Sequence, residues 1–282
     1  MTNLSQNWKR LNTKIRTQDE TSNQLKPNKK FNKIDKPQHN NGNKIRSKTL
    51  SIRKNNNKHE QSLHINPVNK QNLVSPMEYI LWTKEGNKNI LKSEIPNQPQ
   101  LLHKSQKDKR KQPGKYIAMD CEFVGVGPEG ENSALARVTI INYYGHVLLD
   151  EYVQPKEKIT DFRTWVSGIQ PWHLKNALSF EKAQQLTNDL ITGKILIGHA
   201  LNNDLNKLFL DHPFSMIRDT CNFPTFKKIT GGRNPSLKKL SEHFLGIDIQ
   251  VGEHDPIEDS RATMLLFRLF KREFEESMRN KK

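Results

Sequence analysis

Apolar and polar residues follow two different periods in the second half of the chain. Short apolar runs such as 117–119 and 195–197 have the length of buried strands, and residues 133–153 form two further β-rich runs that turn at Gly145. After residue 178 the apolar positions mostly recur at helical spacing. The predicted strands are 115–123, 133–144, 146–153, 194–198 and 216–219, and the predicted helices are 179–191, 202–210, 236–245 and 256–279. Strands that come first and then alternate with helices indicate a mixed-sheet α/β domain of about 165 residues.

Residues 1–114 lack both periods and are rich in Asn, Lys and Gln. They hold 24 Lys and Arg against 8 Asp and Glu, so the formal charge of +16 lies entirely in this segment, and residues 115–282 balance at zero. A segment with few apolar residues and a high net charge cannot bury enough surface to offset the entropy of ordering. We therefore predict a disordered basic arm over 1–114, removable up to residue 112 without loss of the folded domain, which spans 115–282. The charge of the arm attracts phosphate groups.

One apolar stretch interrupts this arm. Ser75, Pro76 and Glu78 have the form of a capping box with proline at the first helical position, and the mostly apolar residues 79–82 follow. The pattern predicts a short helix over 76–84. Such a helix either docks on the domain or on a partner protein, or it forms only transiently.

The apolar pattern also bears on the location of the protein. No apolar segment opens the chain, and no run approaches the roughly 18 apolar residues that cross a bilayer, so we expect neither a secretory signal nor a membrane span. The two cysteines, Cys121 and Cys221, form no C-x-x-C pair and indicate a reducing compartment. Basic clusters such as 104–111 are either nuclear-import signals or phosphate-binding patches.

Two acidic residues interrupt the end of the first predicted strand. Side chains alternate along a strand, so Asp120 and Glu122 project to one face, while Cys121 and Phe123 point the other way and are expected to pack in the core. Buried carboxylates are costly unless they are paired or bind a cation. The two acids therefore indicate either a metal site or a solvated strand end.

A glycine-rich motif follows the same strand. Residues 125–130 match G-x-G-x-x-G, and Asp150 lies twenty residues further on. The dinucleotide-binding motif requires a helix to open at that loop, so that its N-terminus meets the pyrophosphate. Here a β-rich run follows instead, and Pro128 lies inside the loop. We therefore reject dinucleotide binding.

Further acidic residues lie at predicted helix starts. Asp204 falls in the first turn of helix 202–210, directly after a buried strand, where the helix dipole favours an anion. Asp255 is suited to cap the last helix, with His254 just outside it and Asp259 one turn inside. Helix capping or the helix dipole can account for each acid at a helix start taken singly. Neither accounts for Asp120 and Glu122, which lie on a strand.

The repulsion within such an acidic set indicates its chemistry. Two carboxylates about 5 Å apart repel by roughly 3 kcal/mol at an effective dielectric constant near 20. Hard divalent cations remove this repulsion, and an all-carboxylate set suits Mg²⁺ or Mn²⁺ rather than Zn²⁺. Two such ions clamp the attacking and leaving oxygens of a phosphodiester, and a neutral histidine can take the proton from the attacking water. The residues therefore predict two-metal phosphodiester hydrolysis.

The order of these motifs resembles a known family. Asp-x-Glu at 120–122, then Asp204 within GHALNND, then His254-x-x-x-x-Asp259 is similar to the DEDDh 3′→5′ exonucleases. The resemblance covers residues 115–275 and implies a ribonuclease-H-like sheet of five strands, the second antiparallel to the rest, flanked by helices. It also implies two bound Mg²⁺ or Mn²⁺ ions and His254 as general base. The metal ligands that it implies are Asp120, Glu122, Asp204 and Asp259.

Longer strings, among them YIAMDCEFVGVGPEG, ILIGHALNNDL and PSLKKLSEHFLG, resemble a nuclear member of this family that is linked to ribosomal RNA processing. The resemblance implies an exoribonuclease acting on ribosomal RNA precursors, with pre-ribosomal particles as further partners and the nucleus, in particular the nucleolus, as its location. Two alternatives stay open. One is a DNA 3′→5′ exonuclease, because recognition of the 2′-hydroxyl leaves no readable motif. The other is a ribosome-assembly factor that binds RNA through the arm and makes little use of the site, although the intact acids argue against it.

Several neighbouring residues are candidates for binding nucleic acid. The aromatic residue beside the strand acids either lines the pocket for the terminal nucleotide or packs in the core. Loop 167–169 resembles the loop that such exonucleases pack against the terminal base, or it is an ordinary turn. The two residues that flank Asp204 either contact phosphate or orient its carboxylate, and Arg218 and Asp219 form either an ion pair or a substrate contact. The candidates are Phe123, Ser167, Gly168, Ile169, His199 and Asn203.

Overall fold

The computed structural model describes residues 72–86 and 89–279 and contains a mixed sheet of seven strands. The strand order is β7-β5-β4-β3-β8-β9, and β6 pairs with the end of β3. β4 runs antiparallel to β3 and β5, whereas β8 and β9 follow the direction of β3, so the predicted α/β class and the direction of the second strand are confirmed. The strands are β3 (Tyr116–Val126), β4 (Asn132–Asn142), β5 (Val147–Gln154), β6 (Ile159–Asp161), β7 (Leu178–Ser179), β8 (Ile195–Gly198) and β9 (Ile217–Asp219).

β3 lies inside the sheet, and its first residues enter different hydrophobic clusters on the two faces of the sheet. Its side chains alternate, so that Ile117 and Met119 pack into one core cluster and Ala118 into the other. Asp120 and Glu122 continue the row of Ala118 and therefore project to that same face. Helices cover both faces of the sheet, which is why the first part of β3 is a continuous apolar run.

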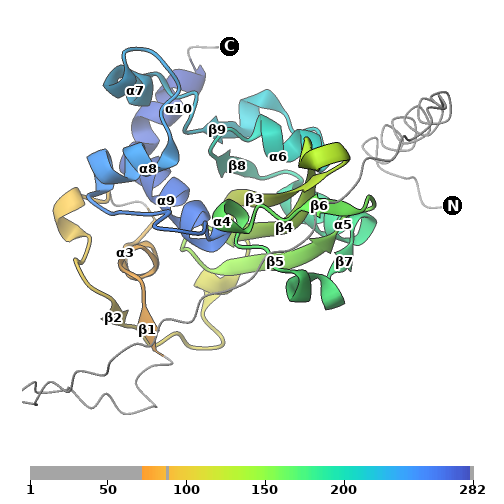
Figure 1. Cartoon of the computed structure of the whole chain (residues 1–282). Helices are drawn as coiled ribbons and strands as arrows, with labels where there is room; N and C mark the ends of the chain where they lie inside the picture. The colour runs from red at the N-terminus through yellow and green to blue at the C-terminus, as the bar shows by residue number, and fades with distance from the viewer. Residues whose placement is uncertain (1–71, 87–88, 280–282) are drawn as a thin grey trace, which may run out of the picture. The chain divides into compact units, whose positions relative to one another are not determined.

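The longer helices of the domain lie against the sheet (Figure 1). α5 (Phe180–Ile191) and the following α6 (Asn202–Lys207) contribute to the cluster of Ile117, and α9 (Pro256–Leu269) and α10 (Lys271–Arg279) to the cluster of Ala118. The helix predicted over 256–279 is thus broken at Phe270, whose backbone leaves the helical conformation.

Shorter helices join these elements. They are α4 (Thr164–Ser167), α7 (Pro224–Lys227) and α8 (Leu237–Leu240), which continues into a π-helical turn (Ser241–Leu245). The 3₁₀ turns are Lys92–Glu94, Lys109–Lys111, Pro128–Gly130, Pro171–Asn176, Phe214–Met216 and Lys228–Thr230. Two helix starts follow from serine caps: the Ser179 hydroxyl accepts from the Lys182 amide and the Ser236 hydroxyl from the Lys239 amide, both at 3.3 Å.

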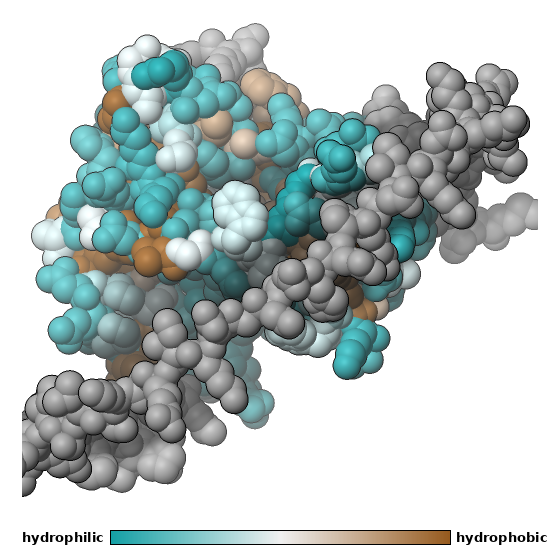
Figure 2. Space-filling view, in the orientation of Figure 1, coloured by the Kyte–Doolittle hydropathy of each residue, from teal (hydrophilic) through white to brown (hydrophobic). Residues whose placement is uncertain are grey.

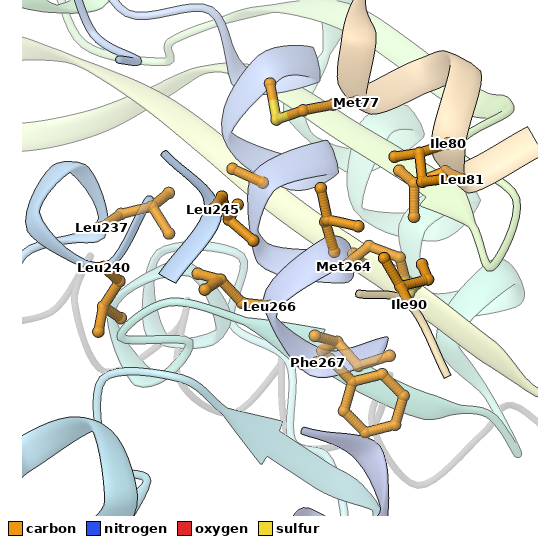
Figure 3. Packing of buried hydrophobic residues seen from close by; sticks show 14 of the residues in the cluster. Met77, Ile80, Leu81, Ile90, Leu237, Leu240, Leu245, Met264, Leu266 and Phe267 are labelled. Carbon is orange, nitrogen blue, oxygen red and sulfur yellow. The ribbon is translucent and has the colours of Figure 1, made fainter. Parts of the chain in front are cut away.

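The segment ahead of β3 also has a defined structure. Besides the short paired strands β1 (Leu73–Val74) and β2 (Gln100–Leu101), it contains α3 (Pro76–Thr83). α3 begins as predicted, because the Ser75 hydroxyl accepts from the Glu78 amide at 3.2 Å and proline occupies the first turn. The buried side chains of α3 are at most 5% exposed, and three of them pack into the same core cluster as α9 (Figure 3). These three are Met77, Ile80 and Leu81, and the fourth buried side chain, Trp82, contacts His146 edge to face instead.

Arg268 of α9 holds the end of α3 in place. Its guanidinium donates to the carbonyl oxygens of Leu81 at 2.7 Å and of Lys84 at 3.0 Å. Of the alternatives left open for helix 76–84, the structure therefore shows docking on the domain. Because the described residues before 115 belong to the same compact unit as the sheet, the boundary drawn after residue 114 lies inside that unit. Residues 1–71 lie outside the described residues, and a disordered arm there stays a prediction.

Hydrophilic side chains dominate one face of the described part of the chain. On the face drawn in Figure 2, hydrophilic side chains cover most of the coloured area and hydrophobic ones show only in separate patches. Among the helices that the structure describes, none has the length and apolar character needed to cross a membrane.

Candidate active site

The two strand acids lie where β3 meets β4. Glu122 is 5% exposed and Asp120 is half-buried. Glu122 pairs in register with Arg137 of β4, but the guanidinium is already engaged, because its Nε donates to Asp150 Oδ1 at 2.8 Å and its second amino group to Asp150 Oδ2 at 2.9 Å. Another nitrogen of Arg137 lies 3.5 Å from Asp255. Glu122 therefore shares the charge of this guanidinium with Asp150 and Asp255.

The third acid, Asp204, lies in the first turn of α6, directly after the turn that leads out of β8. The amide of Ala200, whose φ is +60°, donates to Asp219 Oδ1 at 2.9 Å and fixes this turn. Leu201 packs into the core and Asp204, one turn later, is 4% exposed. Cys121 is buried in the core as expected, and burial together with the nearby Asp204 carboxylate raises the pKa of its thiol.

The fourth acid and the histidine come from the start of α9. Asp255 caps this helix by accepting from the Ile257 amide at 3.1 Å, and Pro256 occupies the first turn, as the sequence predicts. Asp259 is 3% exposed one turn further on. His254 precedes the cap and donates its amide to the carbonyl oxygen of Val166 at 2.7 Å, which ties it to α4.

The four carboxylates influence one another strongly. Burial, followed by the charges of the other three acids, raises the pKa of Asp120 well above its usual value. Burial and the neighbouring Asp259 raise the pKa of Glu122 to about 8, and the nearby Arg137 only partly offsets this. Burial raises the pKa of Asp204 to about 8 and that of Asp259 to about 7. The fold therefore gathers all four predicted acids at one site, at a cost in repulsion when they are ionised.

Their chemistry fits a hard divalent cation. All four donors are carboxylates, and Oδ1 of Asp259 is buried without a hydrogen-bond partner among the described residues, which is costly for a charged oxygen. Within 72–86 and 89–279, however, no three His, Cys, Asp or Glu side chains are arranged so that they could already hold a metal ion. Carboxylates that repel one another would close around an ion only when its charge is present. The assignment of Asp120, Glu122, Asp204 and Asp259 as metal ligands stays a prediction.

His254 lies at the edge of this acidic group. Its Nδ1 is 3.8 Å from Asp259 Oδ2, beyond hydrogen-bond distance, and its side chain is 31% exposed. Partial burial and the positive charge of Lys238 lower its pKa below the usual 6.5. His254 is therefore neutral at pH 7 and can accept a proton from a molecule that approaches the acids.

The loop predicted to contact the terminal base packs against His254. Gly168 has φ of +63°, and a Cβ built there would lie 3.4 Å from the carbonyl oxygen of His254. The side chains of Ser167 and Ile169 are buried, and the Ser167 hydroxyl donates to the carbonyl oxygen of Phe162 at 2.9 Å. The loop thus lies at the site, as Figure 1 shows for α4 beside α9, but two of its three side chains are committed to the core. Its role in binding a base stays a prediction.

The other candidates are dispersed around the acids. Phe123 is half-buried and packs on the core cluster of Ile117, where a β-bulge follows Glu122. His199 places Nδ1 2.9 Å from the Thr220 hydroxyl, and burial lowers its pKa. Asn203 is exposed next to Asp204. Phe123 and His199 therefore have partners within the domain, and Asn203 is open to solvent.

Arg218 and Asp219 do not pair with each other. Arg218 is buried and forms a two-pronged ion pair with Glu275 of α10, at 3.0 and 2.9 Å. Asp219 Oδ1 accepts from the amides of Ala200 and Cys221, both at 2.9 Å. Both residues thus support the fold. Arg218 does form an ion pair, but its partner is Glu275 and not Asp219, the partner considered from the sequence.

Gln250 is a residue of the site that the sequence did not reveal. Its side-chain amide donates to Asp259 Oδ2 at 2.7 Å, although it lies in an irregular loop before α9. No periodicity or motif marks it. The only signal in the sequence is its position within ten residues of His254 and Asp259, which does not by itself predict a contact.

Comparison with known proteins identifies the family of this chain. The chain matches the RNase T exonuclease family over residues 117–267. It is 52% identical to RNA exonuclease 4 of Candida albicans over all of this chain and 99% of that one, and 47% identical to RNA exonuclease 4 of Debaryomyces hansenii over 99% and 96%. Among solved structures, the Pan2 exonuclease module of Saccharomyces cerevisiae in complex with AAUUAA RNA is similar, with a TM-score of 0.51 and 26% identity over 71% of this chain and 35% of that chain.

The Pan2 catalytic unit of Neurospora crassa gives a TM-score of 0.52 with 25% identity, over 72% of this chain and 33% of that one. The chain thus spans about a third of the Pan2 chains and nearly the full length of the first two fungal relatives. The matched range 117–267 contains β3, α6 and the start of α9, and so all four acids and His254. This chain belongs to the RNase T family of DEDD exonucleases and is a 3′→5′ exonuclease, a hydrolase of phosphodiester bonds.

Proposed function

We propose that this exonuclease degrades RNA, using two Mg²⁺ or Mn²⁺ ions bound by Asp120, Glu122, Asp204 and Asp259. The observation that carries the metal assignment is the gathering of four carboxylates whose pKa values are raised, chiefly by burial and, for Asp120 and Glu122, also by the charges of the other acids. DEDD exonucleases are typically metal-dependent. RNA as substrate is supported by the fungal relatives, which are named RNA exonuclease 4, and by the RNA complexes of the Pan2 module.

Ribosomal RNA precursors in the nucleus, in particular the nucleolus, are the physiological substrate that we propose, with pre-ribosomal particles as partners. The support is the likeness of the motifs in 115–275 to a nuclear family member, together with the charge of the preceding segment. Residues 1–71 hold 16 Lys and Arg against 4 Asp and Glu. Such a segment favours contact with a long polyanion.

The residues of the site have separate roles in the proposed reaction. Bound divalent cations would neutralise the scissile phosphate and make a water molecule more acidic. The four carboxylates hold those cations, and their ionised form is the one that binds. His254, neutral at pH 7 and beside Asp259, accepts the proton of the attacking water. The hydrogen bond from the His254 backbone amide to the carbonyl oxygen of Val166 fixes the backbone of His254 beside the acids.

The proposal is tested by comparing nucleic acids of one sequence. The full-length protein is incubated with Mg²⁺ and with single-stranded RNA or DNA that carries a 5′ label and either a free or a blocked 3′ end. We expect a ladder that shortens from the free 3′ end of RNA, no products from the blocked strand, and no products in EDTA. Faster degradation of DNA would overturn the RNA assignment. Binding of RNA without any degradation would favour the assembly-factor alternative.

His254→Ala is expected to lower the rate by about 10²- to 10⁴-fold, because a positioned base contributes that much. Since burial and Lys238 lower the pKa of His254, the parent should lose activity only as the pH falls below about 6.5, and the variant should lack this acid limb. Rates at saturating Mg²⁺ between pH 5 and 8 measure both effects. His243→Ala, the same change at an exposed position, is the matched control. Full activity of the His254 variant would contradict the general-base role.

A further inference from the structure

The two oxygens of the Asp259 carboxylate have different surroundings. Oδ2 accepts a hydrogen bond from the side-chain amide of Gln250 at 2.7 Å. Oδ1 is buried and has no hydrogen-bond partner in the part of the chain that the structure describes. A carboxylate rotates easily about its last bond, since that torsion has broad minima. A single donor on one oxygen therefore decides which oxygen remains available.

Gln250 occupies an unusual backbone conformation. Its φ is +56°, in the left-handed region where glycine is favoured and long side chains are uncommon. Two features accompany it: the neighbouring Ile249 is fully buried, and Lys238 donates a hydrogen bond to the carbonyl oxygen of Gln250 at 3.4 Å. Such conformations persist where the surroundings over-determine them, and they are frequent at functional sites.

The chemistry of an amide suits this position. It donates a hydrogen bond to a carboxylate and carries no charge, so it does not compete with a cation for the same anion. A lysine or arginine in its place would neutralise Asp259, and an apolar residue would leave Oδ2 without a donor in a buried setting. Gln250 thus satisfies one oxygen while it preserves the charge of the group.

We infer that Gln250 is a positioning residue for metal binding: by holding Oδ2 of Asp259, it presents Oδ1 to a divalent cation. The inference rests on the proposed metal-dependent function. Partners of metal ligands in other proteins typically change metal affinity by about 10- to 100-fold when they are removed. A residue kept only for loop structure would change stability instead. These two roles can be separated at this position, because glycine prefers the left-handed conformation that glutamine tolerates poorly.

The test uses the full-length protein with Gln250→Gly. This change relieves the backbone but also removes the donor to Asp259 Oδ2, and because the two effects on stability oppose each other, the melting temperature in EDTA should stay within a few degrees of that of the parent. Mn²⁺ affinity, measured by calorimetry without substrate, should fall by about 10- to 100-fold. Turnover should fall at low Mn²⁺ and recover at high Mn²⁺, with the KM for RNA within about twofold of the parent.

Glu129→Gly is the matched control. Glu129 also has a positive φ, +53°, but it lies exposed in the turn before β4 and contacts none of the acids. This variant should keep the Mn²⁺ affinity of the parent. Unchanged Mn²⁺ affinity in Gln250→Gly would overturn the positioning role, and so would a melting temperature in EDTA so low that the variant is partly unfolded at the temperature of the affinity measurement. A parent protein that binds no Mn²⁺ would refute the proposed function itself, and the inference with it.

Discussion

Asp259→Asn should lower the rate of RNA degradation at least about a thousandfold, because it removes a proposed metal ligand and metal chemistry contributes several kcal/mol to such reactions. The same change should stabilise the metal-free protein at pH 8. Burial raises the pKa of Asp259 to about 7, so the folded protein pays a free-energy penalty for ionising this group. A shift of about three units corresponds to at most about 4 kcal/mol, and we expect a gain of about 1 to 4 kcal/mol.

The pH dependence of the metal-free protein gives the sign of this effect. Glu122 and Asp204 have pKa values of about 8 and Asp259 of about 7, all above their usual values near 4. Between about pH 4 and pH 8 the folded state therefore binds more protons than the unfolded state, and stability decreases as the pH rises. In EDTA the parent should melt at a lower temperature at pH 8 than at pH 5.5. The difference should be smaller in Asp259→Asn, and saturating Mg²⁺ should abolish it in the parent.

Asp248→Asn serves as the control for the change of charge, since Asp248 is exposed in the same domain. This variant should keep the parental rate of RNA degradation. Its melting temperature in EDTA should differ between pH 5.5 and pH 8 by as much as that of the parent. If Asp259→Asn melts below the parent in EDTA at pH 8, the acids do not repel one another as we infer. If it retains the parental rate, Asp259 is not a metal ligand.

The parts of the site that the sequence predicts are those set by local rules. Alternation along β3 places Asp120 and Glu122 on one face of the sheet. The capping signal that begins at Asp255 places His254 and Asp259 at the start of one helix. The pairing register of β4 and β5 then follows from the hairpin that turns at Gly145. These rules act over a few residues, and the structure reproduces them closely.

Contacts between distant segments were not predictable in the same way. Gln250 reaches Asp259 only because a loop with an uncommon backbone angle folds over α9. The segment 72–114 reads as part of a basic arm because its apolar residues are few. Its helix becomes stable only by packing on α9, and its anchor, Arg268, lies 187 residues from Leu81. Composition averaged over a long segment conceals a short element whose partner lies elsewhere.

Deleting residues 1–112 should leave the protein unfolded or insoluble, whereas deleting residues 1–71 should leave it folded. This outcome reverses the expectation that everything up to residue 112 can be removed. The longer deletion removes α3 and its four buried side chains. Each contributes about 1.5–3 kcal/mol, so together they contribute about 6–12 kcal/mol, which is comparable to the whole stability of a typical domain. It also leaves the buried Arg268 without the carbonyl oxygens of Leu81 and Lys84.

The shorter deletion isolates the role of the basic segment. Residues 1–71 hold 16 of the 46 Lys and Arg and only 4 of the 30 Asp and Glu. If about six of these cations engage single-stranded phosphates, log affinity for long RNA should fall against log salt with a slope of roughly −4. Deletion of 1–71 should flatten that slope while the cleavage of a short oligonucleotide at saturating concentration stays nearly unchanged, because the acids and His254 remain. Equal slopes for parent and truncation would show that this segment does not capture RNA. A folded and active protein after deletion of 1–112 would show that α3 is dispensable, contrary to its burial.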